Sequence, residues 1–309
     1  MRHLVTGGAG FIASHVVDRL IAGGEEVAVV DNLSSGRREN VNPQAAFYQI
    51  DIRDRDALAR VFEEFRPQVV NHHAAQIDVR KSVADPVFDA DCNVLGSLNV
   101  ILESVRTGVK HFIYASTGGA IYGEPERTPA DEDHPVSPLA PYGISKHTVE
   151  HYLRMYHANE GLRYVALRYA NIYGPRQDPQ GEAGVMAIFI GRMLAGKRPI
   201  IFGDGTATRD YVYVEDAAAA NEAALRVQKV GVYNVGTAVE TTVLEIVQGL
   251  NGVLGTDLDP EFAPPRPGEV QRIALDARLA QRELGWRPTV SFDEGLRLTA
   301  DWFRGQQAR

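Results

Sequence analysis

The first half of the chain alternates short apolar runs with longer amphipathic segments. The runs, each long enough for one strand, cover residues 3–5, 27–30, 47–50, 69–71, 112–114 and 165–167. The segments with apolar residues at helical spacing cover residues 11–22, 54–65, 90–106 and 142–159. Because successive βα units cross over right-handed into one parallel sheet with helices on both faces, this alternation predicts an α/β fold of the Rossmann type, a doubly wound parallel sheet. Ligands bind such sheets beyond the carboxyl ends of the strands, so functional side chains are expected there.

Beyond about residue 171 this rhythm loosens, and glycine and proline become frequent, as in Gly174-Pro175 and in the stretch 264–268. We therefore expect a cofactor-binding domain over residues 1–171 and a smaller, loop-rich, substrate-binding lobe over residues 172–309. The sequence leaves the boundary between them open. Residues 233–235 predict a late strand that returns to the first sheet.

Charge and composition exclude several classes of protein. The net charge is −8 and the basic residues are scattered, which speaks against a nucleic-acid or anionic-membrane partner. No stretch reaches the ~20 apolar residues that span a bilayer, and the first residues are typical of a strand rather than a signal peptide, so a cytoplasmic protein is expected. Cys92 is the only cysteine, which excludes a disulfide framework and a cysteine-based zinc site within one chain.

A glycine-rich turn follows the first predicted strand. Gly7 suits a tight turn, and Gly10 lets the backbone approach a pyrophosphate at the N-terminus of the next helix, where free N–H groups favour anions. Ala13 is small enough for close packing of that helix on the strand. The turn therefore predicts a dinucleotide site.

Acidic residues follow the second and third predicted strands. Asp31 stands where a carboxylate accepts hydrogen bonds from the adenosine ribose and repels a 2′-phosphate, so NAD is favoured over NADP. Arg37 and Arg38 would soften that preference only if they reached the ribose; otherwise they belong to a solvated loop. For Asp51 two interpretations stand side by side, an acceptor for the adenine amino group, with Ile52 packed on the ring, or a helix cap.

The segment His72-His73-Ala74-Ala75-Gln76 follows the fourth predicted strand. The paired alanines allow a flat nucleotide to approach the backbone. The histidines point to opposite sides of an extended strand, and no carboxylate stands at ligand spacing, so no metal site is expected.

A phenol and an ammonium group share one helical face, because Tyr142 and Lys146 are four residues apart. The cation stabilises phenolate, which allows the tyrosine to act as a base, helped by a nearby nicotinamide charge. Ser116 and Thr117 follow the fifth strand and reach the same edge of the sheet, where a hydroxyl can bind a substrate oxygen and relay its proton. Taken alone, Tyr142 and Lys146 would also suit an ordinary surface pair.

The combined pattern resembles the extended short-chain dehydrogenase/reductase family, and within it the epimerases that act at C4 of UDP-glucose and UDP-galactose. The resemblance spans nearly the whole chain, through residues 6–15, 31–32, 51–52, 74–75, 142–146, 168–171, 209–211 and 266–269. It implies an enzyme with tightly bound NAD. The cofactor contacts that it implies are Gly7, Gly10, Phe11, Ile12, Asp31, Asn32, Asp51, Ile52, Ala74, Ala75, Gln76, Tyr142 and Lys146.

One position departs from the family pattern. The family's catalytic serine or threonine lies four residues before the tyrosine of a Tyr-Gly pair, and here that position is Gly118. The hydroxyl must come from a neighbour, for which Thr117 is the first choice and Ser116 the second.

The residues before Tyr122 help to choose the reaction. Related dehydratases carry an Asp-Glu pair there and related decarboxylases a Glu, because elimination needs an acid and a base beside the sugar. Gly119 and Ala120 transfer no protons, so epimerisation through a 4-keto intermediate, as in galactose metabolism, is favoured. A nucleotide-sugar dehydratase or reductase, and a cofactor-binding sensor without turnover, are the alternatives.

The second half supplies groups for a UDP-sugar. Arginine suits phosphate, and by the resemblance Arg209 and Arg266 grip the pyrophosphate. The other substrate contacts that the resemblance implies are Thr117, Tyr142, Asn171, Val185, Ile201, Phe202, Tyr211 and Glu269. For Tyr211, a place in the apolar core is an equal alternative.

Two helices, predicted over residues 90–106 and 142–159, carry apolar faces. Relatives use these faces in a four-helix contact, which implies a homodimer. The same periodicity also fits burial within one chain.

Overall fold

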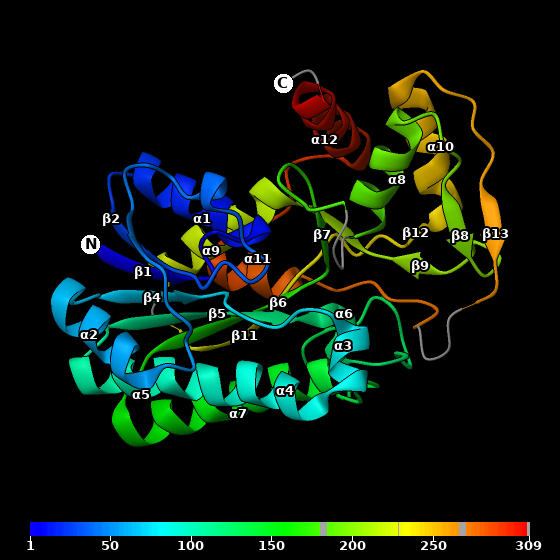
Figure 1. Ribbon diagram of the computed structural model, residues 1–309. Helices are drawn as coiled ribbons and strands as arrows, with labels where there is room; N and C mark the ends of the chain where they lie inside the picture. Colours follow the sequence, from blue (N-terminus) through cyan, green and yellow to red (C-terminus); the bar gives the residue numbers. More distant parts are fainter. Residues whose placement is uncertain (180–183, 228, 266–269, 308–309) are drawn as a thin grey trace.

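The computed structural model describes residues 1–179, 184–227, 229–265 and 270–307 (Figure 1). Its centre is a parallel sheet in the order β11-β6-β5-β4-β1-β2-β3. The strands are β1 (Arg2–Thr6), β2 (Glu26–Val30), β3 (Ala46–Tyr48), β4 (Val69–His72), β5 (His111–Thr117), β6 (Tyr164–Tyr169) and β11 (Gly231–Val235). The order reverses beside β1, which confirms the predicted doubly wound Rossmann-type sheet, and the late strand at residues 233–235 lies in β11.

Helices cover both faces of this sheet (Figure 1). One layer contains α1 (Phe11–Ala22), α9 (Val214–Arg226) and α11 (Arg278–Leu284), and the other contains α2 (Arg55–Phe65), α3 (Val79–Ala84), α4 (Pro86–Ala90), α5 (Gly96–Thr107) and α7 (Pro141–Glu160). Successive strand residues point to opposite faces. Leu4 therefore packs into the core beneath α2 and α5, and Val5 into the core beneath α1.

The helix predicted over residues 90–106 differs at its beginning. The chain turns helical at Pro86, after the N-cap Asp85, whose side chain accepts a hydrogen bond from the Phe88 N–H at 3.0 Å. A π-helical segment, Asp91–Leu95, then joins α4 to α5. A pattern of period 3.6 does not predict such a turn, which occurs often at functional sites.

A smaller lobe stands beside the carboxyl ends of the strands (Figure 1). Three two-stranded sheets build this end of the molecule, β7 with β10, β9 with β12 and β8 with β13. The elements are β7 (Asn171–Tyr173), α8 (Val185–Leu194), β8 (Ile200–Phe202), β9 (Thr208–Arg209), β10 (Tyr211–Tyr213), β12 (Thr241–Thr242), α10 (Val243–Leu254), β13 (Glu261–Ala263) and α12 (Phe292–Gln307). Their apolar side chains join one core with residues of β5 and β6.

Two short helices complete the described elements, η1 (Arg38–Asn40) and α6 (Gly118–Ile121). Within the ranges given above, no helix has the length and apolar character needed to cross a membrane.

Candidate active site

The turn between β1 and α1 lies against the segment after β4. Gly7 has a φ of +71°, and a Cβ atom there would lie 2.7 Å from the Ala74 amide nitrogen, so no side chain fits. The Gly7 N–H donates to the Val30 carbonyl at 2.7 Å. Gly10 is the N-cap of α1 without a side-chain cap, so the first N–H groups of the helix, from Phe11 and Ile12 onward, are available to an anion.

Asp31 follows β2 and faces this turn. Its carboxylate accepts hydrogen bonds from the Ala9 N–H at 3.0 Å and the Leu33 N–H at 2.8 Å. Burial raises the pKa of Asp31, while these two N–H groups act in the opposite direction. The nearby arginines are engaged elsewhere, since Arg37 pairs with Asp178 and Glu39 and Arg38 lies over the Phe47 ring. The glycine turn and the single acid fit a dinucleotide without a 2′-phosphate.

Asp51 lies beside Asn32 at the end of β3. Asn32 Nδ2 donates to Asp51 Oδ2 at 2.8 Å, and Arg53 forms an ion pair with the same carboxylate at 2.8 Å. The Arg53 guanidinium holds the pKa of Asp51 well below its usual range. The helix-cap interpretation of Asp51 is wrong, because Asp54 caps α2 by accepting from the Ala57 N–H at 3.0 Å.

The segment after β4, residues 74–76, is held in place by side chains. The Ala74 N–H donates to Thr6 Oγ1 at 3.2 Å. Asn93, in the π-helical segment, accepts from the Gln76 N–H at 2.8 Å and donates to the Gln76 carbonyl at 2.9 Å. This short segment is therefore fixed against both β1 and the helical layer.

The two adjacent histidines enter different surroundings. His72 contacts Thr6 Oγ1 at 2.6 Å and Ser97 Oγ at 2.8 Å, whereas His73 contacts Asn221 Oδ1 at 3.2 Å. Among the residues that the structure describes, no three His, Cys, Asp or Glu side chains are grouped to hold a metal ion.

Tyr142 and Lys146 lie in the first turns of α7, next to the end of β5. Tyr142 forms a side-chain hydrogen bond with Thr117. Lys146 Nζ donates to the Ala115 carbonyl at 2.8 Å and lies 6.0 Å from the centre of the Tyr142 ring. The structure therefore brings together the phenol, the ammonium group and the Thr117 hydroxyl.

Burial dominates the protonation of this pair. It raises the pKa of Tyr142, the charge of Asp89 adds to the rise, and the hydrogen bond with Thr117 acts against it. Burial lowers the pKa of Lys146 to about 8, while Asp89 and Glu150 act in the opposite direction. Lys146 Nζ therefore stands near the phenol but donates its hydrogen bond to the Ala115 carbonyl.

Ser116, the second choice for the hydroxyl, lies elsewhere. Consecutive strand residues alternate between faces, and Ser116 Oγ donates to Glu150 Oε1 at 2.6 Å in a buried position. The Ser116 hydroxyl is thus engaged with Glu150, which favours Thr117 as the hydroxyl of the site.

The side chain of Leu275 packs against Gly118. A Cβ atom on Gly118 would overlap Leu275 Cδ1 and lie 2.9 Å from Cδ2, so the leucine fills the space that a larger side chain would need. A Cβ atom on Gly119 would meet Asn171 Oδ1 at 3.6 Å and Thr117 Oγ1 at 3.9 Å, which locates both polar groups around Gly119.

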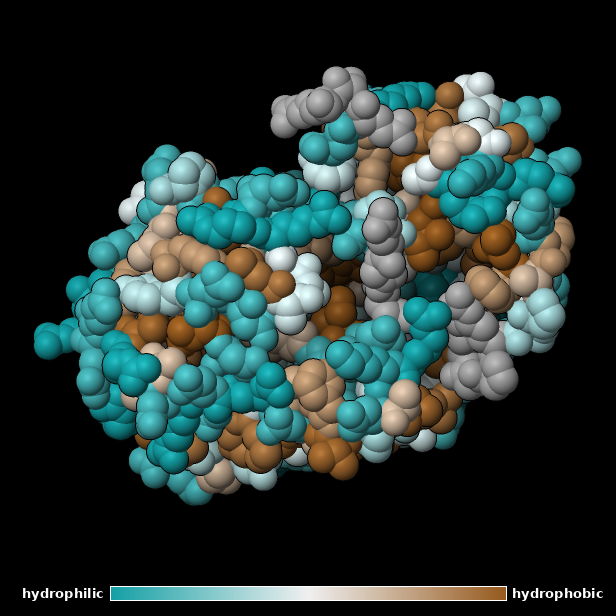
Figure 2. Space-filling view, viewed as in Figure 1, coloured by the Kyte–Doolittle hydropathy of each residue, from teal (hydrophilic) through white to brown (hydrophobic). Residues whose placement is uncertain are grey.

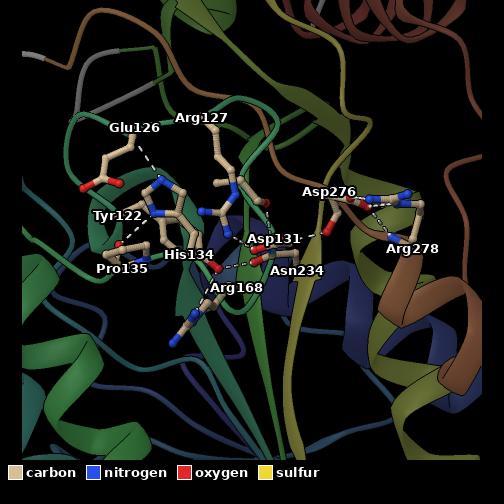
Figure 3. Close-up of polar contacts among 11 residues, drawn as sticks. Tyr122, Glu126, Arg127, Asp131, His134, Pro135, Arg168, Asn234, Asp276 and Arg278 are labelled. Carbon is tan, nitrogen blue, oxygen red and sulfur yellow. Dashed lines mark hydrogen bonds and ion pairs between the residues drawn. The ribbon is translucent and has the colours of Figure 1, made fainter.

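A buried polar network connects Glu150 of α7 with Arg168, Tyr122 and Asn234, and Figure 3 shows the last three of these residues. Arg168 donates to Glu150 at 2.7 Å and 3.0 Å and to the Tyr122 hydroxyl at 2.9 Å. The Tyr122 hydroxyl donates to Asn234 Oδ1 at 2.8 Å, and its ring contacts His134 edge to face. The network joins α7, β6 and β11 behind the reacting side chains.

A hollow lies between the larger part of the molecule and the smaller lobe (Figure 2). Asn171 and Arg209 come from the short strands at this junction, and both are partly buried. Arg209 Nη1 donates to the Thr208 carbonyl at 2.8 Å. Val185 is the first residue of α8 and is partly buried.

Ile201 and Tyr211 lie in the apolar core of the lobe. Ile201 is buried, and the Tyr211 ring contacts those of Tyr173 and Phe292 at centroid distances of 6.3 Å and 6.2 Å. Tyr211 is therefore buried in the apolar core, as one of its two interpretations has it. Phe202, by contrast, is 42% exposed. The predicted contacts at Arg266 and Glu269 lie outside the described residues.

Sequence reasoning missed two buried polar residues at the site, Asp89 and Asn93. Both stand where helical periodicity suggests only a surface acid and a surface amide. A signal was present in their spacing of four residues, which places them on one helical face.

The glycine turn and the Tyr142–Lys146 pair together describe a Rossmann-fold enzyme of the tyrosine–lysine type. The chain belongs to the NAD dependent epimerase/dehydratase family, whose model matches residues 3–236. It is 45% identical over 312 residues to a UDP-glucose 4-epimerase of Mycolicibacterium smegmatis, with 99% of each chain covered.

Two solved structures are similar over almost the whole chain. The UDP-glucose 4-epimerase of Thermotoga maritima, solved with UDP-glucose, is 50% identical with a TM-score of 0.98 and covers 99% of this chain and 100% of its own. The UDP-glucose 4-epimerase of Thermus thermophilus, solved with NAD, is 50% identical with a TM-score of 0.94 and 99% coverage of both chains.

Proposed function

We propose that this protein catalyses the NAD-dependent epimerisation of a UDP-linked hexose at C4, interconverting UDP-galactose and UDP-glucose. The observation that carries the proposal is the meeting of Tyr142 and Thr117 beside Gly119 and Asn171 at the carboxyl edge of the sheet. The names of the similar proteins support the same reaction.

The cofactor site fits NAD by its shape and charge. Gly7 and the free N–H groups of α1 would hold the pyrophosphate, Asp31 the adenosine ribose, and residues 51–52 and 74–76 the adenine side. NAD bound there would supply reversible hydride transfer with the sugar, so the reaction would have no net redox change.

The side chains of the site divide the proton chemistry. Tyr142 removes the proton of the sugar 4-hydroxyl and later returns it to the 4-keto intermediate. Thr117 hydrogen-bonds the same oxygen and lowers the pKa of the phenol. Lys146 supplies a positive charge within 6.0 Å of the Tyr142 ring. Gly119 adds no acid or base for elimination, which favours epimerisation over dehydration.

The substrate's nucleotide would lie in the hollow towards the smaller lobe. Arg209 and Arg266 would hold the pyrophosphate, and Asn171, Val185 and Phe202 would line the path of the sugar and base, with Glu269 on the ribose. Ile201 and Tyr211 support this surface from the core behind it.

Apolar side chains on the outer face of the helical layer support a homodimer. Val87 of α4 is 77% exposed, Leu95 is 54% exposed, and Ile144 of α7 is 53% exposed. A second copy of the chain on this face would form a four-helix contact and cover these side chains.

The direct test supplies purified protein with UDP-galactose, without added NAD, and follows UDP-glucose by NMR. We expect turnover in the wild type and a loss of at least about 10²-fold in kcat for Tyr142→Phe, because the general base is removed. Tyr156→Phe is the matched control, since it removes a hydroxyl about 21 Å further along the same helix. Formation of a dehydrated sugar would indicate a dehydratase, and no turnover with NAD bound would indicate a sensor.

A further inference from the structure

Asp89 of α4 is a fully buried acid between the cofactor segment and the catalytic helix. Its Oδ1 accepts hydrogen bonds from Gln76 Nε2 at 3.1 Å and from Asn93 Nδ2 at 2.9 Å, and its Oδ2 accepts from Ser145 Oγ at 2.7 Å. The side chain has no exposed surface. A buried carboxylate costs free energy unless it is hydrogen-bonded and faces a positive charge, so this position calls for an explanation.

The three hydrogen-bond partners of Asp89 connect the cofactor segment, residues 74–76, with the catalytic helix α7. Gln76 ends the segment after β4, and Asn93 holds its backbone from both sides. Ser145 stands between Tyr142 and Lys146 on α7 and is itself buried. One carboxylate therefore joins the segment assigned to the cofactor to the helix that carries the base.

We propose that Asp89 is a positioning residue that fixes the distance between the cofactor segment at Gln76 and the Tyr142–Lys146 pair. The proposal rests on the proposed function, since it concerns the same reaction. The three hydrogen bonds that Asp89 accepts come from neutral donors, so the negative charge of its carboxylate is not neutralised by them and can act on Lys146.

The groups that face Lys146 support an electrostatic role as well. Asp89 and Glu150 are the anionic side chains that raise the pKa of Lys146 against its burial. Burial lowers the pKa of His72, which ends β4, and of His73 after it, and raises the pKa of Tyr114 on β5, so burial favours the uncharged form of these three neighbours. Asp89 also raises the pKa of Tyr142, so its loss should shift both groups in the same direction.

The test compares Asp89→Asn with the wild type, because the amide keeps the shape of the side chain and removes its charge. We expect a kcat lower by about tenfold or more with KM for UDP-galactose within about threefold, as for a misplaced catalytic group. Both limbs of the pH profile of kcat/KM should move to lower pH. Asp85→Asn is the matched control, since it removes an exposed acid from the same helix and keeps an N-cap residue.

A second variant guards against misfolding. Ser145→Ala removes one hydrogen bond and keeps the charge, so kcat should fall while the limbs of the pH profile stay in place. The NAD retained through gel filtration, measured by absorbance after denaturation, should fall in Asp89→Asn and remain in Asp85→Asn. The proposal would be overturned if Asp89→Asn had the same kcat, the same pH profile and the same NAD content as the wild type. It would also be overturned if Ser145→Ala left kcat unchanged. An inactive wild type would instead contradict the proposed function, and the NAD content would still test Asp89.

Discussion

Leu275 occupies the space beside Gly118, and this packing predicts what happens when the family's usual hydroxyl is restored. In Gly118→Ser the new Cβ would overlap Leu275 Cδ1. The leucine has little room to retreat, because its N–H donates to Asp210 at 3.0 Å and its side chain packs in a cluster with Tyr122, Ala130 and Ile273. Overpacking of this kind lowers the free energy of unfolding by about 1–3 kcal/mol.

The compensating change is Leu275→Ala. Alone it should cost about 2–5 kcal/mol, because it opens a cavity in a fully buried position. In the double variant, which combines Leu275→Ala with Gly118→Ser, the introduced serine fills part of that cavity, so the loss should be smaller than the sum by about 1–3 kcal/mol. Urea unfolding of the four proteins measures this coupling.

Measurements of kcat test the same pair of residues, Gly118 and Leu275, independently of stability. Thr117→Ala should lower kcat by about 10²-fold in the wild-type background, where it removes the hydroxyl beside Tyr142. In the double variant the same change should cost much less, because the serine introduced by Gly118→Ser offers a replacement hydroxyl. A Gly118→Ser protein as stable as the wild type, or additive free energies within about 0.5 kcal/mol, would refute the idea that Leu275 excludes the hydroxyl.

Three further predictions follow, two from buried charged or titratable groups and one from an exposed apolar residue. Burial lowers the pKa of His3 and of His111 to about 4. As the pH falls, the unfolded chain, whose histidines have the ordinary pKa near 6.5, binds protons before the folded chain does. The contribution of each histidine to the free energy of unfolding should therefore be fully present above pH 6.5 and should decrease by roughly 3 kcal/mol per histidine towards pH 4. Urea unfolding at stepped pH checks this, and a slope that His111→Phe leaves unchanged would contradict it. Glu150→Ala strands the buried Arg168 charge and should cost about 3–5 kcal/mol, whereas Glu150→Leu with Arg168→Met should recover most of it in the same assay. For the homodimer proposed above, Ile144→Glu should give a monomer in light scattering, whereas Val239→Glu, at another exposed apolar residue, should have no such effect.

Much of the fold and part of the site could be predicted from local patterns. The βα alternation predicts the sheet because strands and helices have different hydrophobic periods in the sequence. Gly7 and Tyr142 are recognised as site residues from the residues next to them in the sequence. The sequence left Thr117 and Ser116 as alternatives, and the structure favours Thr117, because consecutive strand residues point to opposite faces and Thr117 is the one of the two that hydrogen-bonds with Tyr142.

The remaining features depend on contacts between distant segments. Leu275 meets Gly118 across 157 positions of sequence, and no local pattern connects them. Asp89 looks like a surface acid in the sequence, and its burial depends on contacts with Gln76, Asn93 and Ser145, two of which lie in other elements. Ile201 and Tyr211 stand in strands of three residues, which are too short for a period to tell the core from the cleft.

The place of β11 at the edge of the sheet bears on how the nascent chain emerges from the ribosome. β11 pairs with β6 along its whole length, but its residues are synthesised only after those of the smaller lobe's first half. Until then every residue of β6, all of them buried in the finished protein, borders an unpaired edge. The growing chain thus carries an open, aggregation-prone strand while residues 170–230 are synthesised, and chaperone protection should matter most before Gly231–Val235 has been made.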